Sequence, residues 1–286
     1  MKLKRLKEII GFGSIILSAF IVVLILGIII FDITAKGIGT ISWQFLIDFP
    51  RDGMTKGGIL PAIIGTIYVT FITALFSIPF GVSCAIYLSE YAKEGKLTSF
   101  IRAALKNLAG VPSIIYGLFG VALFVHALQF GTSILSSGLT LGLLTLPWIV
   151  TASEEAIKTV PQTYREASFA LGATKWQTIR TVVLPYALPG ILTGSILGLS
   201  RACGEIAPIL FTGVVFYLPK LPSSIFDQFM ALPYHLYVLS TQHHDIEQVR
   251  PLAYGTALVL LSLVFILNLS AIILRANFRK KFGKGV

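Results

Sequence analysis

The sequence predicts an all-α integral membrane protein with six transmembrane helices. Three observations lead to this class: 55% of the 286 residues are hydrophobic, only 13% are charged, and the mean hydropathy is +0.83. Soluble domains carry about 25% charged residues, so this chain has roughly half the usual solvating surface. Composition therefore excludes a soluble enzyme, a disordered chain and a fibrous chain.

Six apolar segments are long enough to cross a bilayer, which takes about 20 residues in a helix. The second and fifth contain Pro61, Pro79 and Pro208, so tilt or local breaks are expected there. The first follows a basic N-terminus but is too long for the apolar core of a signal peptide, so we expect a retained helix. The segments are Ile9–Phe31, Ile59–Leu88, Leu108–Gln129, Ile134–Ala152, Ala187–Tyr217 and Leu252–Arg275.

The basic residues gather in alternate loops. Of the 23 Lys and Arg residues, 17 lie in segments 1–8, 90–107, 153–185 and 275–286. The opposite loops 32–58, 130–133 and 218–251 hold five. The positive-inside bias places both termini in the cytoplasm, which agrees with an even number of spans. The net charge of +10 is therefore mainly an orientation signal, and no nucleic-acid partner is expected.

Loop 153–185 has the sequence of two short capped helices. Thr163 and Glu166 have the spacing of a capping box, and Thr174 opens a second box. The first helix is expected to end at Gly172, where a left-handed cap is available. The second is expected to run to Leu184 and to be ended by Pro185.

Small residues gather at the corner between these two helices, at Ala167, Ser168 and Gly172. They would let another backbone or a flat surface approach closely. From the residues alone, two interpretations are open: a projection that docks on another protein, or an amphipathic connector that lies on the lipid headgroups.

The loop also contains Glu166-Ala167-Ser168, then Gly172 after three residues, and Val182 to Pro185 after nine more. This longer pattern resembles the EAA loop of the permeases of ABC importers. It departs from that pattern at Ser168, where the family has Ala, and at Val182, where it has Ile. The resemblance implies that the helix pair sits in a groove of an ATP-binding subunit and transmits its closure. It also implies that Glu166 caps or bonds at the projection, that Ala167 allows close packing and that Gly172 makes the turn. The matching residues are Glu166, Ala167, Ser168, Gly172, Val182, Leu184 and Pro185.

The chain has no ATPase motif of its own. A phosphate-binding loop needs a glycine five residues before a Gly-Lys pair and a hydroxyl residue after it. The pairs Gly95-Lys96 and Gly283-Lys284 lack both. We therefore expect a transport subunit, not an enzyme, that binds no cofactor, with ATP and Mg²⁺ used by separate ATPase subunits.

One predicted span carries two charges well inside it, Arg201 and Glu205. Charges within a span are costly, by ~2.5–3.5 kcal/mol on insertion scales, and usually mark function. The two residues share a helix face. They form either a buried ion pair that fixes packing, or a site in the translocation path where Arg201 binds a small oxyanion and Glu205 holds it when empty.

The same predicted helix is rich in small residues, among them Gly190, Gly194 and Gly198. Small residues at this density let a neighbouring helix approach closely. The neighbour is expected either within the bundle or at a seam with a second, related subunit, because no internal repeat supplies a second half of the pore.

Segment 200–212 resembles the permease A subunits of bacterial phosphate importers, the PstA family, with Ile206 for Thr as the main departure. The resemblance covers residues 58–275, which we take as a type I ABC-importer permease domain. It leaves an N-terminal helix and extracytoplasmic loop, 1–57, and a cytoplasmic basic tail, 276–286. It implies a heteromeric complex in the cytoplasmic membrane. The implied partners are a related PstC-like permease, two PstB-like ATPases and an extracytoplasmic PstS-like phosphate-binding protein.

Other functions remain as alternatives with different strengths. One alternative is an importer for another oxyanion, such as molybdate or sulfate. These anions differ from phosphate in size and protonation, and a single arginine cannot discriminate between them on that basis. A stand-alone channel or secondary transporter leaves the docking loop unexplained, and an intramembrane enzyme lacks a nucleophile or paired carboxylates. His243 and His244 are expected in a solvated polar loop, and loop 218–251 is the candidate contact for the external binding protein.

Overall fold

The computed structural model describes residues 2–282, with the side chains of residues 11–278. It confirms the all-α class: within these residues, five helices are long and apolar enough to cross a membrane, or six if one bent pair counts as a span. The last four residues of the expected tail 276–286 lie outside the described residues. The five helices are α1 (Lys2–Gly37), α3 (Leu60–Ile86), α6 (Ile134–Lys158), α9 (Leu184–Ala202) and α12 (Ile246–Phe282).

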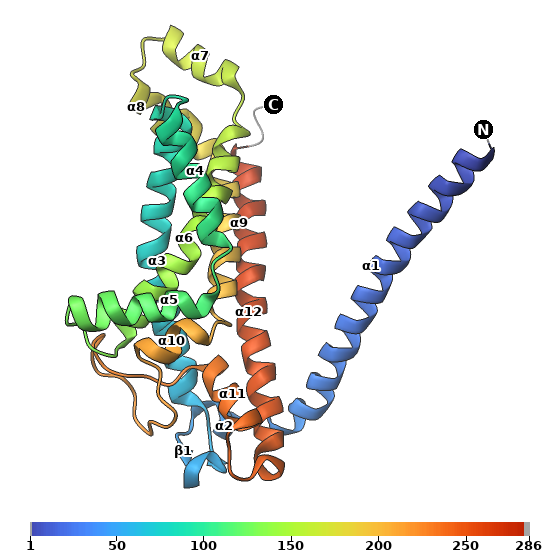
Figure 1. Ribbon diagram of the computed structural model, residues 1–286, viewed down its shortest axis with the longest axis vertical. Helices are drawn as coiled ribbons and strands as arrows, with labels where there is room; N and C mark the ends of the chain where they lie inside the picture. The colour runs from blue at the N-terminus through green and yellow to red at the C-terminus, as the bar shows by residue number, and fades with distance from the viewer. Residues whose placement is uncertain (1, 283–286) are drawn as a thin grey trace.

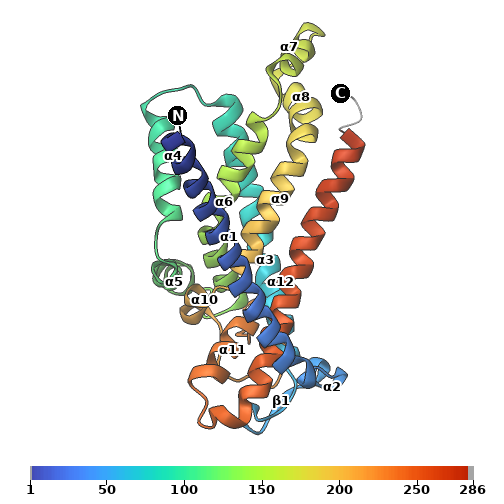
Figure 2. The same cartoon turned by 90° about the vertical axis from the view of Figure 1, so that its right-hand side faces the viewer.

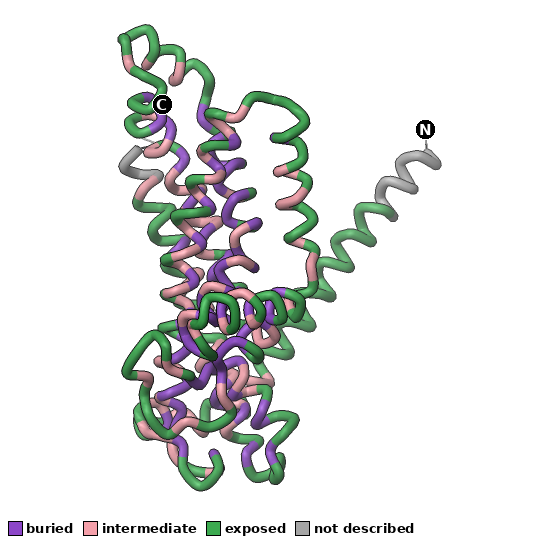
Figure 3. Tube along the Cα trace, turned by 60° about the vertical axis from the view of Figure 1, so that its left-hand side comes forward, coloured by how far each residue is buried: buried purple, intermediate pink, exposed green. Residues whose placement is uncertain are grey.

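Helix α6 lies at the centre of the bundle, between α3 and α9 (Figures 1 and 3). Of its apolar stretch 67% is buried, against 28% for α3 and 6% for α12. Several buried hydroxyls on these helices bond to the preceding turn of their own helix, as Thr73 does to the carbonyl of Val69 at 2.8 Å. These hydroxyls are satisfied without water, as a helix in lipid requires, whereas the buried hydroxyls of Ser153 and Ser195 have no partner among the described residues.

Glycines on one face of α9 allow a close crossing with α6. A Cβ built on Gly194 would lie 2.3 Å from the Cβ of Ala152, and one on Gly190 would lie 2.7 Å from the Cβ of Ala156. Such a small-residue stripe is the usual means of bringing two membrane helices together. The neighbour of Gly190 and Gly194 is therefore α6, a helix within the bundle of this chain, which is one of the two neighbours that the sequence allowed.

Overpacking this crossing should destabilise the bundle. Gly194→Leu is expected to lower the free energy of unfolding by about 1–3 kcal/mol, because neither helix can move without disturbing the core. Thermal unfolding of the purified chain in detergent checks this. Gly27→Leu is the matched control, since a Cβ at Gly27 meets no atom within 4 Å; equal unfolding temperatures for the two variants would contradict the packing role.

The expected third span, Leu108–Gln129, is wrong as a single helix. The chain instead forms α4 (Lys96–Ala109) and α5 (Ser113–Gly120), which continues as the π-helical η4 (Val121–Ala127). The two halves are bent by 103°, so α4 runs along the bundle and α5 lies across it (Figures 1 and 2). Pro112 lacks an N–H and restricts the residue before it, which breaks the helix. The Tyr116 hydroxyl donates to the Leu108 carbonyl at 2.9 Å across the bend.

The expected fifth span, Ala187–Tyr217, is too long. Helix α9 ends at Ala202, a turn follows, and the short α10 (Ala207–Thr212) begins with Pro208 in its first turn. The N–H of Gly204 closes the turn on the Arg201 carbonyl at 3.1 Å. A proline near the start of α10 fits a new helix but not the continuation of α9, which explains the break.

The end of the bundle opposite α7 (Gln162–Ala170) is closed by a compact cap (Figure 2). Its core joins residues far apart in the sequence, such as Phe45, Met54, Met230 and Val249, all at most 4% exposed. His235 of α11 (Leu232–Thr241) is buried, and its Nδ1 has no hydrogen-bond partner among the described residues. Burial lowers the pKa of His235 to about 4, so the imidazole is neutral at pH 7. The cap contains η1 (Ile38–Thr40), α2 (Trp43–Ile47), β1 (Pro50–Arg51), η2 (Asp52–Met54), β2 (Lys56–Gly57), which pairs antiparallel with β1, and α11 (Leu232–Thr241).

The expectation that His243 lies in a solvated loop is wrong. Its side chain is buried, with Nε2 2.9 Å from the Gly53 carbonyl. Nδ1 lies 3.1 Å from the backbone nitrogen of Asp245 and 3.2 Å from its carbonyl oxygen. His243 therefore ties two loops of the cap together.

Helix α1 departs from the bundle (Figure 1). None of its apolar stretch is buried in this chain. It meets α12 near its end, where a Cβ on Gly37 would lie 2.7 Å from the Tyr254 carbonyl and where the Lys36 ammonium donates to the Tyr254 hydroxyl at 3.3 Å. A long apolar helix with no cover from its own chain is exposed to lipid or to another subunit.

Candidate functional site

Two short helices project beyond the bundle at the end where α12 finishes (Figures 1 and 2). They are α7 (Gln162–Ala170) and α8 (Lys175–Thr178). The expected capping box at Thr163 is wrong. With Thr163 as the N-cap the helix would begin at Tyr164, but α7 begins two residues earlier, directly after Pro161, and no side chain of the described residues caps it. The fixed φ of proline prepares the chain for the first helical turn without a polar cap.

The corner between α7 and α8 forms as expected at Gly172. Its φ is +81°, in the left-handed region. The Ala173 N–H reaches back to the Ser168 carbonyl at 3.2 Å, and the Gly172 N–H to the Phe169 carbonyl at 2.9 Å. These two backbone hydrogen bonds form a Schellman cap, and glycine adopts the left-handed conformation that the cap needs without steric cost. Leu171, beside the corner, is 91% exposed.

The capping box at the start of α8 is confirmed. The Gln177 N–H donates to the Thr174 hydroxyl at 3.3 Å, and the Thr174 N–H donates to the Gln177 side chain at 2.7 Å. The hydroxyls of Ser168 and Thr178 lie 2.9 Å apart and join the two helices. The corner at Gly172, the capping box of α8 and the contact between the two hydroxyls together give the helix pair α7–α8 a defined local structure.

The expectation that Pro185 ends the second helix is wrong. The π-helical segment η5 (Ile179–Val183) follows α8 and leads directly into α9, so Lys175–Ala202 is one span of 28 residues. The Leu184 N–H bonds to the Ile179 carbonyl, five residues back. This wider turn accommodates Pro185, which has no N–H to offer the helix. The projection is thus joined rigidly to α9.

Glu166 and Ala167 are exposed on α7. Within the described residues Glu166 makes no hydrogen bond or ion pair with its own chain, so the expected bonding role finds no partner here. The neighbouring Arg165 does the anchoring instead. Its guanidinium pairs with Glu90 at 2.8 Å and donates to the carbonyls of Val160 at 2.6 Å and Ile157 at 3.1 Å.

Sequence reasoning missed the Arg165–Glu90 pair because 75 residues separate its members. The side chains are 12% and 10% exposed, so the pair is largely desolvated. Glu90 is the second-to-last residue of η3 (Tyr87–Tyr91), the π-helical continuation of α3. The pair therefore ties α7 to the ends of both α3 and α6, beside a polar cavity of about 570 Å³ that also contains Lys158 and Lys175.

Removing Glu90 should loosen α7. Glu90→Gln leaves Arg165 largely buried without a counter-charge, a change that typically costs about 3–5 kcal/mol. We expect trypsin to cleave around α7 roughly tenfold faster, measured by limited proteolysis of the purified chain. The control Glu155→Gln breaks the exposed Lys158–Glu155 pair (49% and 67% exposed) and should change little. Equal cleavage rates in the two variants would rule out the anchoring role.

The second predicted site lies at the far end of α9. Arg201 is in its last turn, and Glu205 lies in the turn beyond it, with Nε and Oε1 3.6 Å apart. The shared face is thus observed, although Glu205 is outside the helix. The side chains are 49% and 18% exposed, so Arg201 lies at the surface of this chain. Sequence reasoning missed Trp148 of α6, whose ring lies 4.8 Å from the Arg201 Cζ.

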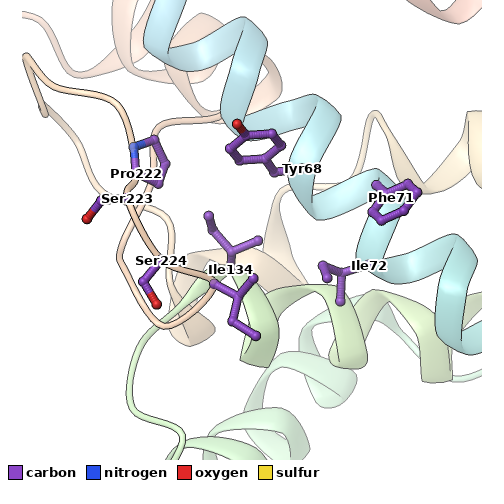
Figure 4. Close-up of a pocket in the computed structure, with 8 residues that line it drawn as sticks. Tyr68, Phe71, Ile72, Ile134, Pro222, Ser223 and Ser224 are labelled. Atoms are coloured by element: carbon purple, nitrogen blue, oxygen red, sulfur yellow. The ribbon is translucent and has the colours of Figure 1, made fainter.

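A second cavity, of about 330 Å³, lies between α3 and the loop after α10 (Figure 4). Its lining is mainly apolar and includes Tyr68, Phe71 and Ser224, with no cationic side chain among the described residues. Hydrogen bonds from Ser223 and Ser224 hold the pKa of the nearby Asp227 carboxyl below its usual value. The cavity therefore lacks the charge that an anion site requires, and Arg201 remains the candidate.

A bundle of apolar spans, a capped projection at one end and a charged pair at the end of one span define a polytopic membrane permease. Residues 77–284 match the model of the binding-protein-dependent transport system inner membrane component, and the chain belongs to this family. The chain is thus a multi-pass membrane protein and a transport subunit.

Curated relatives refine the comparison. The chain is 38% identical over 220 residues to the phosphate transport system permease protein PstA 1 of Mycobacterium tuberculosis, covering 77% of this chain and 71% of the relative. It is 35% identical over 238 residues to a probable PstA of Methanocaldococcus jannaschii, covering 82% and 81%. It is 34% identical over 280 residues to the probable ABC transporter permease protein YqgI of Bacillus subtilis, covering 94% and 95%. The resemblance to the PstA family is confirmed.

Solved structures confirm the expected fold. A bacterial alginate ABC transporter has a chain with a TM-score of 0.66 and 14% identity, covering 98% of both chains. The methionine ABC transporter MetNI gives a TM-score of 0.62 and 18% identity, covering 77% of this chain and 95% of that one. The fold is that of ABC-importer permeases.

Proposed function

We propose that this chain is a permease subunit of an ATP-driven importer that moves inorganic phosphate across the cytoplasmic membrane by alternating access. The observation that carries the proposal is Arg201, a half-exposed guanidinium at the end of a membrane-spanning helix. The names of the relatives support phosphate as the substrate, since two of those compared are phosphate permeases.

Arg201 and Glu205 suit an anion that must be bound and then released. A guanidinium offers several N–H donors in a fixed plane, which match the oxygens of a phosphate. Glu205 lies near enough to neutralise Arg201 electrostatically, but at 3.6 Å it does not saturate those donors. An arriving oxyanion therefore competes with one carboxylate, which keeps its binding reversible.

The α7–α8 projection is proposed as the docking element for the ATPase subunits. Glu166 and Ala167 are exposed there, without bonds that would occupy them within the described chain. Because η5 joins α8 to α9 without a break, movement of the projection is transmitted along α9 toward Arg201. ATP-driven closure of the partners would thus shift the balance between two packings of the bundle.

The remaining partners follow from the open surfaces. Helix α1, uncovered by its own chain, and the exposed Arg201 fit a second, PstC-like permease that completes the pore. The cap around α11 is proposed as the contact for a PstS-like phosphate-binding protein. We also propose that the end of the bundle with α7 lies in the cytoplasm together with both termini, because the loops expected on that side carry most of the basic residues.

Substrate competition tests the proposal. The complete complex in proteoliposomes, with binding protein added outside, is expected to take up radiolabelled phosphate when ATP is enclosed. Excess unlabelled phosphate should compete, whereas sulfate and molybdate at equal concentration should not. ATP-driven uptake of sulfate or molybdate, with no uptake of phosphate, would favour the alternative oxyanion importer and refute phosphate as the substrate.

A further inference from the structure

We propose that Trp148 is a positioning residue for Arg201, holding the guanidinium by its face so that its N–H donors stay free for the anion. The inference rests on the proposed function of Arg201. The Arg201 Cζ lies over the Trp148 ring at 4.8 Å from the centroid, within the range of about 6 Å for a cation–π contact.

The way Arg201 is held leaves its hydrogen-bonding capacity unused. A guanidinium has five N–H donors. With the described residues of this chain Arg201 makes no hydrogen bond; its contacts are the ring of Trp148 and the 3.6 Å approach to Glu205. A contact with an aromatic face restrains the cation without using an N–H donor. Arg165 differs, because its N–H donors are occupied by a carboxylate and by backbone carbonyls. Arg201 is thus restrained but unsaturated, as a binding group should be.

The backbones beneath both side chains are held close together. A Cβ on Gly198, three residues before Arg201, would lie 3.5 Å from the side chain of Ile149, the neighbour of Trp148. On the other side, the Ser200 hydroxyl donates to the Asn268 side chain of α12 at 2.9 Å. Because α9 is fixed against both α6 and α12 here, the indole has a set position relative to the guanidinium.

Both members of the contact lie at the surface of the chain. Trp148 is 45% exposed and the Arg201 side chain 49% exposed. A tryptophan placed only for core packing would be buried, and one placed only for contact with lipid would not need a cation on its face. The exposed position of Trp148 beside Arg201 therefore favours a role for Trp148 in the proposed translocation path.

The kinetic test uses the complete complex in proteoliposomes. Trp148→Leu removes the aromatic face and is expected to raise the KM for phosphate about 3- to 10-fold with little change in maximal rate, as loss of a cation–π contact predicts. Trp148→Phe keeps a smaller face and should restore most of the affinity. An unchanged KM in Trp148→Leu, or a maximal rate that falls in both variants alike, would overturn the positioning role.

Two further measurements separate this inference from the function on which it rests. If Arg201→Ala transports phosphate normally, the proposed role of Arg201 in anion binding fails, and the positioning role of Trp148 fails with it, while phosphate import by the complex stands. If Arg201→Ala abolishes uptake while Trp148→Leu keeps the KM, only the positioning role fails. The contact itself is tested by fluorescence of the purified chain with Trp43 and Trp176 replaced by Phe. We expect Arg201→Ala to change the emission of Trp148, and an identical spectrum would contradict the contact.

Discussion

Arg201→Ala is expected to lower phosphate uptake by about 10- to 100-fold while the complex assembles in normal amount. Hydrogen bonds to a charged group contribute about 1.5–3 kcal/mol, so losing the guanidinium donors is expected to cost about 10- to 100-fold in anion binding. Arg201 is the one Lys or Arg residue within α9 (Leu184–Ala202), so no other residue of this helix can replace it. The measurement is ATP-driven uptake of radiolabelled phosphate by proteoliposomes, with the amount of complex determined by quantitative immunoblot.

The chain offers a matched control for this variant. Arg250 is also an arginine with a nearby carboxylate, Glu247, and its side chain is 53% exposed, but it lies at the start of α12 near the cap. Arg250→Ala should leave uptake within about twofold, since an exposed ion pair contributes little. Arg201→Lys should be intermediate, because lysine keeps the charge but loses the planar fork. Normal uptake in Arg201→Ala would leave Arg201 only a packing role.

Gly172→Val is expected to uncouple ATP hydrolysis from transport while membrane insertion stays intact. A left-handed conformation costs a residue with a side chain about 1–2 kcal/mol, and more when it is β-branched. A Cβ at Gly172 meets no atom within 4 Å, so the effect comes from the backbone alone. The altered corner would change how α7 and α8 meet the ATPases. The ratio of phosphate moved to ATP hydrolysed measures the effect.

Gly95 provides the control for this experiment. It lies just before α4, its backbone is extended, and a Cβ there also meets no atom within 4 Å. Gly95→Val should therefore keep the native coupling ratio. Gly172→Asn should keep most of it, because asparagine tolerates the left-handed region. A native ratio in Gly172→Val would show that the corner does not transmit closure.

Local features were predictable from the sequence, and the reason is physical. The corner at Gly172 and the capping box at Thr174 depend on contacts within four or five residues, so the spacing alone defines them. The pair Arg201–Glu205 is likewise one turn apart. Hydropathy located five of the six predicted spans as long helices, since each is a continuous apolar stretch.

Features that depend on tertiary contacts were not predictable in the same way. Pro185 was expected to end a helix, but the wider turn of η5 lets the helix continue, and residue spacing does not reveal a π-helical turn. The bend near Pro112 divides an apolar stretch whose composition resembles a single span. Arg165 pairs with Glu90, and Arg201 lies on the ring of Trp148. In each case the partner comes from another helix, so only the packed bundle brings the two side chains together.

Comparing this chain alone with the complete complex in proteoliposomes tests the proposed function most directly. In that proposal this chain provides a path and two packings of the bundle, while partner subunits provide the energy. Phosphate uptake should therefore require enclosed ATP, the second permease, the ATPases and the binding protein together, and should be absent for this chain alone. Efficient phosphate uptake by the chain alone, or by the complex without ATP, would contradict it.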